Sequence, residues 1–191
     1  MRMFAAVLPP EPVLDAIEEF WGVRRESGSF RWSPREQWHL TLAFFAEVPQ
    51  RSYDDLADRL GRAARKRSPM TVALAGGGAF PDAGRAKVLW AGLEASPDDG
   101  EELLRLATGC RAAGNRAGAP PDGQRFRAHL TLARLGRPED VTRWVRLLET
   151  FRSPSWRIEE IALVAAYLGE GERGRPRYEV METLPLGHSE R

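Results

Sequence analysis

A five-residue sequence, His-Leu-Thr-Leu-Ala, occurs twice in the chain, within "QWHLTLAFF" and within "RAHLTLARL". The first copy places His39 next but one to Thr41, and the second places His129 next but one to Thr131, in a chain with only three histidines. If each copy is a β-strand, histidine and threonine share one face and the leucines share the other. Core packing requires the leucines but not a repeated polar pair, so the repetition favours a functional role.

Two histidines around one pocket can supply both an acid and a base. The unperturbed imidazole pKa of about 6.5 allows one ring to be neutral while the other is protonated. Cleavage of a phosphodiester needs such a pair, because one ring takes a proton from the attacking oxygen and the other gives one to the leaving oxygen. The threonine hydroxyls can donate hydrogen bonds to the phosphate oxygens. The pattern predicts phosphodiester chemistry with a bell-shaped pH dependence around neutrality.

A zinc site is the alternative use of two histidines. Zinc needs three or four close ligands. The third histidine, His188, lies in the tail "LGHSER", and Cys110 has no partner at metal-ligand spacing. We therefore expect no metal and no other cofactor.

The elements that must position these residues follow from the apolar pattern. Alternating apolar residues predict strands at 1–9, 38–48, 70–80, 87–95, 126–135, 158–168 and 178–186. Helical spacing predicts helices within 9–27, 52–67, 97–114 and 137–151. This order indicates a duplicated β-α-β-α-β unit and an α+β fold with two pseudo-symmetric lobes, each an antiparallel-rich sheet with helices on its outer face. We expect residues 1–191 to form a single bilobal domain, with the two histidine strands facing each other across a groove between the lobes.

Composition limits the protein class. The 191 residues are 42% hydrophobic and 29% charged, and no apolar run is long enough to span a bilayer. The apolar run at the N-terminus is too short for a signal peptide. A single cysteine is typical of a reducing compartment, so we expect a cytoplasmic protein. We also expect a monomer with no membrane partner. The net charge of +1 gives no overall field that would attract nucleic acid, so any anion site must be local.

The repeated motifs and their flanks resemble the two-histidine phosphoesterase superfamily, whose signature is a pair of His-x-Thr-x motifs. Within it, the chain is most similar to the bacterial and archaeal RNA 2′,3′-cyclic phosphodiesterases, also called 2′-5′ RNA ligases. The likeness covers nearly the whole chain, from "MRMFAAVLPP" through both motifs to "LVAAYLGEGERGRPRYEVMETLPL". The resemblance implies a metal-independent enzyme that opens a terminal 2′,3′-cyclic phosphate, on RNA or on a cyclic nucleotide, to a 2′-phosphate.

Residue roles also follow from the resemblance. It implies that His39 is the proton donor to the leaving 3′ oxygen, that His129 is the proton acceptor that activates water, and that Thr41 and Thr131 hold the phosphate. The family also uses an arginine at the end of the second motif, and Arg134 occupies that position here.

The position of Arg134 raises a geometric question. By simple alternation Arg134 lies on the leucine side of its strand, so it reaches the phosphate only if the strand ends or bulges there. The first motif has Phe44 at the equivalent place, so the two halves are not interchangeable. Many relatives have a proline before the second histidine where this chain has Ala128, a change that removes no chemical group.

Two further residues are candidates for substrate binding. Arg127 shares the face of His129 and is a candidate contact for phosphate or the RNA backbone, with a solvent-facing arginine as the alternative. Phe45 shares the face of His39 by alternation and is a candidate for stacking a base at the mouth of the groove, with core filling as the alternative. The remaining aromatic residues near the motifs are interpreted as packing residues, namely Trp32, Trp38, Trp90, Phe126 and Trp144.

Other functions use the same residues. Joining of tRNA-like halves through a 2′-5′ linkage replaces the attacking water by a 5′-hydroxyl, and the sequence does not separate this ligation from hydrolysis. A non-catalytic protein that binds RNA ends or nucleotides is a third hypothesis. Two intact histidines count against it, because a binder gains more from fixed positive charge than from titrating imidazoles.

Overall fold

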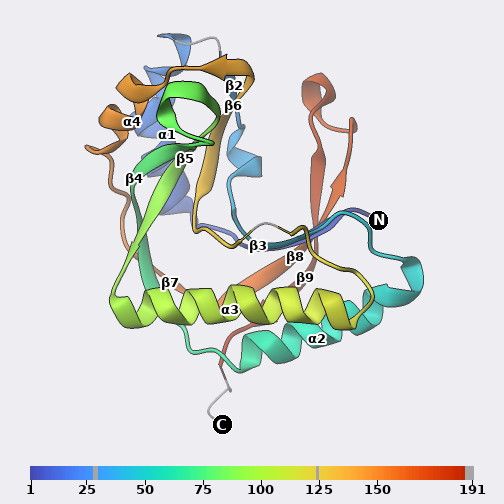
Figure 1. Cartoon of the computed structure of the whole chain (residues 1–191). Coiled ribbons are helices and arrows are strands. Elements are labelled where there is room, and N and C mark those ends of the chain that lie inside the picture. Colours follow the sequence, from blue (N-terminus) through green and yellow to red (C-terminus); the bar gives the residue numbers. More distant parts are fainter. Residues whose placement is uncertain (28–29, 124, 188–191) are drawn as a thin grey trace.

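A computed structural model describes residues 1–27, 30–123 and 125–187 (Figure 1). These residues form one curled antiparallel sheet and four α-helices. The strands are β1 (Met3–Val7), β2 (Arg31–Trp32), β3 (Leu40–Phe45), β4 (Met70–Phe80), β5 (Ala86–Ala95), β6 (Leu130–Glu139), β7 (Trp156–Ile158), β8 (Glu160–Tyr167) and β9 (Arg177–Pro185). The helices are α1 (Glu11–Gly22), α2 (Tyr53–Arg65), α3 (Pro97–Arg116) and α4 (Thr142–Leu148). The mixed α+β class expected from the sequence is confirmed.

The two motif strands meet at the middle of the sheet. The strand order is β7-β4-β5-β6-β3-β1-β8-β9, with β2 beside β6. Strands β3 and β6 share one residue pair, Leu40 opposite Leu130, whereas the other neighbours pair over longer stretches. The sheet therefore divides at this point into a first lobe, β3-β1-β8-β9, and a second lobe, β6-β5-β4-β7. The lobes were expected to be separate sheets, but this contact joins them into one.

Each lobe contains strands from both halves of the chain. Strand β4 follows the first motif in sequence, yet it pairs with β5 in the second lobe. Strand β8 follows the second motif, yet it pairs with β1 in the first lobe. Because β4 and β8 each pair in the other lobe, the strands of the two lobes occupy matching positions, as duplication with two-fold symmetry requires. The matching pairs are β3 with β6, β1 with β5, and β8 with β4.

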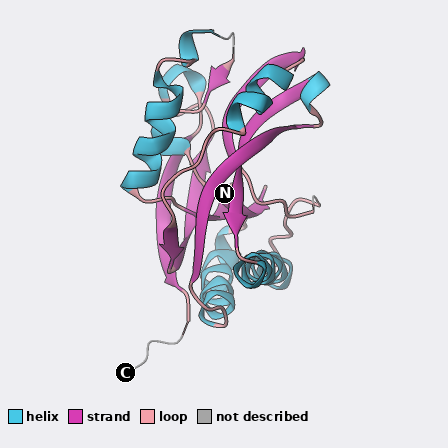
Figure 2. Ribbon diagram, turned by 90° about the vertical axis from the view of Figure 1, so that its left-hand side faces the viewer, coloured by secondary structure: helices cyan, strands magenta, loops and turns pink. Residues whose placement is uncertain are grey.

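The helices cover the two lobes in pairs. Helices α1 and α4 lie against the second lobe, and α2 and α3 lie side by side beneath the first (Figures 1 and 2). Trp21 of α1 joins the first pair, because its ring is 5.0 Å from that of Trp32 and 5.5 Å from that of Trp144. Helix α2 buries Leu56 and Leu60, four residues apart on one face. No helix in the described ranges is both long and apolar enough to cross a membrane.

Local sequence explains the start of α3, whereas other element ends differ from the prediction. Helix α3 begins after Ser96, whose hydroxyl accepts a hydrogen bond from the backbone N–H of Asp99 at 3.1 Å. The predicted helix within 137–151 is shorter than expected, because β6 continues to Glu139 and α4 begins only at Thr142. The short strands β2 and β7 were not predicted, since two or three residues carry no readable alternation.

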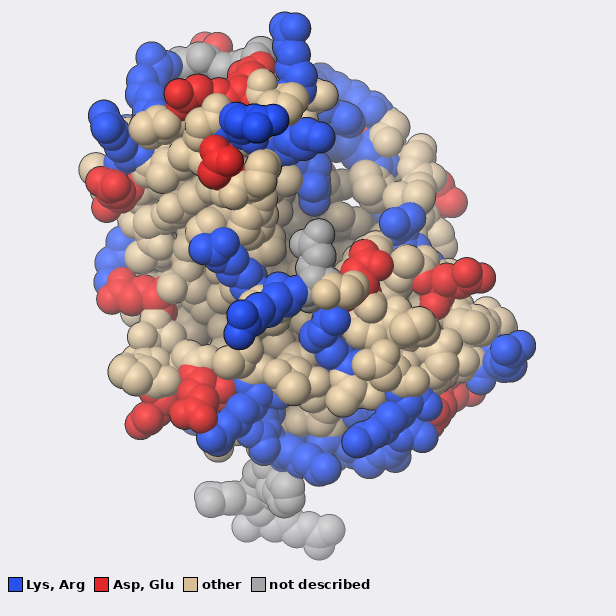
Figure 3. Space-filling model, in the orientation of Figure 1, with Lys and Arg blue, Asp and Glu red and all other residues tan. Residues whose placement is uncertain are grey.

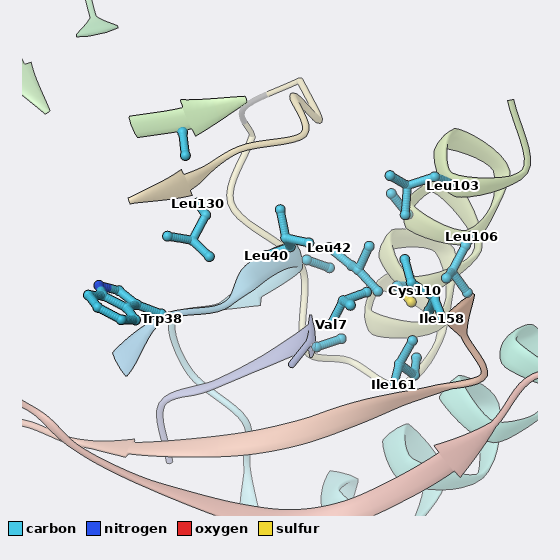
Figure 4. Close-up of a cluster of buried hydrophobic side chains, with 14 of the residues drawn as sticks. Val7, Trp38, Leu40, Leu42, Leu103, Leu106, Cys110, Leu130, Ile158 and Ile161 are labelled. Atoms are coloured by element: carbon cyan, nitrogen blue, oxygen red, sulfur yellow. The ribbon is translucent and has the colours of Figure 1, made fainter. Parts of the chain in front are cut away.

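The leucines of the motif strands build the core. Leu40, Leu42 and Leu130 are at most 2% exposed and belong to one cluster of buried hydrophobic side chains (Figure 4). In the close-up, Leu42 lies toward the face of α3 that carries Leu106 and Cys110. Burial raises the pKa of the Cys110 thiol to about 12, so this cysteine is an unreactive core residue.

Candidate active site

Both motif strands contain the same irregularity. In β3, Ala5 of the neighbouring strand is opposite Ala43 but the next residue, Ala6, is opposite Thr41, so Leu42 is an extra residue. In β6 the same shift leaves Leu132 without a partner, between Ala133 opposite Leu89 and Thr131 opposite Trp90. Each strand therefore bulges one residue after its threonine.

The bulges change which side chains face the cavity. One extra residue reverses the in-and-out alternation beyond it, so the third residue after each threonine returns to the threonine's face. In β6 this residue is Arg134, and the bulge on which its proposed role depended is present. In β3 it is Phe44, whereas Phe45 is fully buried in the core. The prediction that Phe45 lines the groove is wrong, because it assumed unbroken alternation.

The two copies of the motif converge on one cavity. A cavity with a volume of about 190 Å³ is lined by His39 and Thr41 from the first lobe and by His129 and Thr131 from the second, together with Arg134. Its wall also contains residues that lie far apart in the sequence, including Arg2, Phe4, Ser33, Gln37, Phe44 and Tyr178. The central expectation from the sequence, that two distant histidines share a groove, agrees with this geometry.

The two imidazoles are held in the same way. Nδ1 of His39 donates to the carbonyl oxygen of Gln37 at 2.7 Å, and Nδ1 of His129 donates to the carbonyl oxygen of Arg127 at 2.6 Å. In both cases the acceptor lies two residues before the histidine. With Nδ1 committed to the backbone, Nε2 of each ring is the nitrogen available for proton transfer. Nε2 of His39 also lies 2.9 Å from Oγ1 of Thr41.

Burial makes both histidines weak bases in the free enzyme. It lowers the pKa of His39 to about 4, although the hydrogen bond to the Gln37 carbonyl acts in the opposite direction. Burial also lowers the pKa of His129, and again the backbone hydrogen bond opposes the shift. The positive charge of Arg134 lowers the pKa of both rings further. Both imidazoles are thus neutral at pH 7 until an anion enters the cavity.

Aromatic side chains support the two rings differently. Phe4 stacks on His39 with ring centroids 4.5 Å apart, and Tyr178 meets His39 edge-on at 5.6 Å. His129 has no such stacked neighbour among the described residues, and it meets Phe80 edge-on at 4.9 Å. Sequence reasoning missed Phe4, Tyr178 and Phe80, because their strands reach the site only through long-range pairing whose register no local pattern specifies.

A second, larger cavity of about 800 Å³ adjoins the site on the side of His129. It shares His129, Thr131 and Arg134 with the first cavity and is otherwise lined by Phe80, Val88, Arg125, Phe126 and Arg127. Arg127 faces this space, with its guanidinium 5.6 Å from the ring centroid of Phe80 and 5.7 Å from that of Trp90. Phe126, expected only to pack, also lines the cavity.

The other aromatic residues pack as expected. Trp38 and Trp144 are buried in the core, and Trp32 and Trp90 are partly buried. No group of three or more potential metal ligands occurs among the residues that the structure describes. His188, named above as an unsuitable third ligand, lies outside the described residues.

Comparisons with known proteins agree with this arrangement. A family model described as the 2′-5′ RNA ligase superfamily matches residues 9–170. The chain is 34% identical to an RNA 2′,3′-cyclic phosphodiesterase of Thermus thermophilus, over 97% of this chain and 90% of the relative.

Solved structures show the same likeness. The crystal structure of TT0787 of Thermus thermophilus superposes with a TM-score of 0.77 at 33% identity, covering 98% of this chain and 100% of the other. Escherichia coli LigT, crystallised in complex with 3′-AMP, superposes with a TM-score of 0.76 at 26% identity, covering 98% of each chain.

Proposed function

Because this chain belongs to the 2′-5′ RNA ligase superfamily, we propose that it is an RNA 2′,3′-cyclic phosphodiesterase that converts a terminal 2′,3′-cyclic phosphate to a 2′-phosphate. The observation that carries the proposal is the shared cavity. It gathers two imidazoles, each anchored through Nδ1, and the two threonines of the motifs. The relative from Thermus thermophilus, similar over most of its length, is named an RNA 2′,3′-cyclic phosphodiesterase.

The proposed mechanism uses the histidines as a base and an acid. Nε2 of His129 takes a proton from water, whose oxygen forms a bond to phosphorus. The bond between phosphorus and the 3′ oxygen breaks, and Nε2 of His39 gives its proton to that oxygen. The product carries a 2′-phosphate and a 3′-hydroxyl, and the enzyme regains its starting state when the proton returns from His129 to His39 through solvent.

Thr41, Thr131 and Arg134 hold the phosphate in this proposal. All three line the same cavity as the two histidines. Their hydroxyl and guanidinium groups donate to the non-bridging oxygens, where negative charge increases as phosphorus becomes pentacoordinate. The guanidinium fork also suits two oxygens of one phosphate, which a lysine does not match.

The substrate itself helps to form the proton donor, His39. His39 is neutral in the free enzyme, because burial lowers its pKa to about 4. A phosphate anion beside the ring stabilises the protonated form and raises this pKa. Nε2 of His39, 2.9 Å from Thr41 Oγ1 in the free enzyme, exchanges this contact for the phosphate. Substrate binding and formation of the proton donor are therefore coupled.

Ligation is a second candidate, and one observation favours it. The larger cavity lies beside His129, the ring proposed to activate the nucleophile, and about 800 Å³ leaves room for an RNA end. Arg125 and Arg127 in its wall are suited to phosphates, and Phe80 and Phe126 to bases. A 5′-hydroxyl held there replaces water and gives a 2′-5′ linkage through the same transition state.

The test uses a short RNA that ends in a 2′,3′-cyclic phosphate, incubated with and without a second RNA that carries a 5′-hydroxyl. We expect a 2′-phosphate product, no inhibition by chelators, and loss of turnover in both His39→Ala and His129→Ala. A 3′-phosphate product would contradict the assigned polarity, and chelator inhibition would favour a metal site. A longer, 2′-5′-linked product would identify ligation.

The cellular setting is also part of the proposal. We expect a cytoplasmic enzyme that acts as a monomer without a membrane partner. Both copies of the motif come from one chain, so the site needs no second subunit. The single cysteine is fully buried and free, which fits a reducing compartment.

A further inference from the structure

We propose that the groove between α2 and α3, on the side of the first lobe away from the catalytic cavity, binds the phosphate backbone of the RNA whose end is processed. This inference rests on the proposed function and extends it to the body of the substrate. The groove has a volume of about 670 Å³. Its basic lining residues are Arg59, Arg62, Lys66, Arg67, Arg105 and Arg116, and its one acidic lining residue is Glu101.

The two helices approach each other closely at this groove, because small residues lie where they meet. Gly109 of α3 faces Ala63 of α2, and a Cβ added at Gly109 would lie 3.3 Å from the Cβ of Ala63. Ala112 and Ala113 continue the floor along α3. Small residues thus lie where the helices meet, and long basic residues line the same groove.

The basic residues follow one face of each helix. On α2, Arg59, Arg62 and Lys66 are three and four residues apart and therefore lie along one side of the helix. On α3, Arg105 and Arg116 lie eleven residues apart, which is close to three turns. Figure 3 shows basic side chains gathered along the lower edge of the molecule, where Figure 1 places these helices.

Some of these charges are already neutralised and others are not. Arg59 pairs with Asp55 at 2.8 Å, Arg67 with Glu102 at 3.1 Å, and Arg105 with Glu101 at 2.5 Å. Within the described part of the chain, no ion pair or hydrogen bond occupies the side chains of Arg62, Lys66 or Arg116, which are exposed. These three cations remain available to an external anion, although the net charge of the whole chain is only +1.

The lining indicates which part of an RNA would bind. Among the described residues it contains no aromatic side chain, so these residues offer bases no surface on which to stack. Cationic side chains on two parallel edges instead suit the phosphates of a backbone, and arginine in particular matches phosphate geometry. We therefore expect contact without sequence preference, most favourable for a folded stem that presents regularly spaced phosphates.

One short segment of the chain links the groove to the larger cavity beside His129. Helix α3 ends at Arg116, and the segment that follows it leads directly to His129. This segment carries Arg125 and Arg127, both of which line the larger cavity beside His129. An RNA with its end in the cavity and its stem along α2 and α3 would thus meet arginines at both ends of this segment.

The test compares two substrates and two double variants. One variant is Arg62→Gln/Lys66→Gln, and its control is Arg137→Gln/Arg146→Gln, which removes the same charge from exposed positions of the second lobe. The substrates are a cyclic mononucleotide and a hairpin RNA that ends in a 2′,3′-cyclic phosphate. We expect the groove variant to raise KM for the hairpin about tenfold, with turnover of the mononucleotide unchanged and the control close to wild type.

Direct binding separates the failure of this inference from the failure of the proposed function. Fluorescence anisotropy with a 3′-phosphate hairpin needs no turnover. We expect the salt dependence of binding to weaken in the groove variant, with a log–log slope smaller by about 1.8 if two phosphate contacts to the duplex stem are lost. Equal hairpin affinity in the groove variant and wild type, or equal loss in the control, would overturn the inference. Equally strong displacement of the hairpin by polyglutamate would also overturn it and indicate an acidic protein partner.

Discussion

Arg134 occupies on β6 the position that Phe44 occupies on β3, and both face the catalytic cavity because each strand bulges at the leucine two residues earlier. The two lobes therefore share a backbone irregularity but use it for different side chains. One bulge directs a cation to the cavity and the other directs an aromatic ring to it. The symmetry of the fold positions two equivalent histidines, and this difference gives them unequal surroundings.

Replacement of Arg134 tests the functional value of its bulge. We expect Arg134→Ala to lower kcat/KM by about 10²–10³-fold, because a charged donor to the developing phosphate charge is lost. Arg134→Lys restores the charge but not the planar fork, and it should recover only part of the activity. Steady-state kinetics on a cyclic nucleotide provide the measurement, and full activity in Arg134→Ala would remove Arg134 from the site.

The two threonines are expected to differ in one respect. Thr41→Val and Thr131→Val each remove a hydroxyl with little change in shape, and each should lower kcat by about 10²-fold. Oγ1 of Thr41 also lies 2.9 Å from Nε2 of His39, whereas no hydrogen bond joins Thr131 to His129 in the described part of the chain. Only Thr41→Val should therefore alter the pH dependence assigned to His39. Identical pH–rate profiles for both variants would contradict this asymmetry.

Replacement of Phe44 should affect substrate binding, whereas replacement of Phe45 should affect stability. Phe45 is fully buried, and a Cβ added at Gly114 would lie 2.4 Å from its ring, so the ring fills the space beside α3. We expect Phe45→Ala to lower the free energy of unfolding by roughly 3–5 kcal/mol. Phe44→Ala should instead change KM, with a much smaller effect on stability. Urea denaturation and kinetics of both variants give the comparison, and the reverse pattern would restore the original interpretation of Phe45.

Local pattern was sufficient for most of the secondary structure and for the four motif residues. His39 and His129 could be brought together in the prediction because repetition indicated duplication, and duplication implies symmetry. The bulges at Leu42 and Leu132 could not be predicted, because a bulge depends on pairing with the neighbouring strand and leaves no mark on the composition. The error at Phe45 and the open question at Arg134 had this one cause.

Tertiary pairing explains the remaining omissions. Phe4 comes from the first strand and Tyr178 from the last, and they meet at His39 because β1 lies between β3 and β8, and β8 pairs with β9. Predicting these neighbours requires the order of the strands in the sheet. That order differs from the order in sequence, because β4 pairs in the second lobe and β8 pairs in the first. A groove between two helices, such as that near Gly109, likewise depends on how closely the helices approach each other.

The stability of the protein should decrease on acidification through His39. Its pKa is about 4 in the folded chain and about 6.5 in the unfolded chain. Between these pH values the unfolded chain binds a proton at His39 more readily than the folded chain does. The contribution of neutral His39 to the free energy of unfolding is therefore complete above pH 6.5 and is lost as the pH falls toward 4. We expect the free energy of unfolding to decrease by an amount on the order of 2 kcal/mol. This is less than the full pKa difference implies, because the His39 ring is partly exposed. Urea denaturation at pH 7 and pH 4.5 should show a smaller difference for His39→Gln than for wild type.

The pH dependence of catalysis should differ between the free enzyme and the substrate complex. The ratio kcat/KM reports the free enzyme, in which burial and Arg134 lower the pKa of both His39 and His129. Activity requires one protonated and one neutral ring, so the optimum of kcat/KM should lie below pH 6.5, between the two apparent values of the coupled pair.

In the complex the phosphate anion raises the pKa of the ring beside it, so the optimum of kcat should lie at higher pH than that of kcat/KM. Arg2 and Arg134 lie in the cavity wall, the charge of Arg127 also lowers the pKa of His129, and burial raises the pKa of the Tyr178 phenol. Arg134→Gln removes one of these charges and should move the optimum of kcat/KM upward, even though activity falls. Coincident optima for kcat and kcat/KM in the wild-type enzyme would mean that the substrate does not control the protonation of the histidine pair.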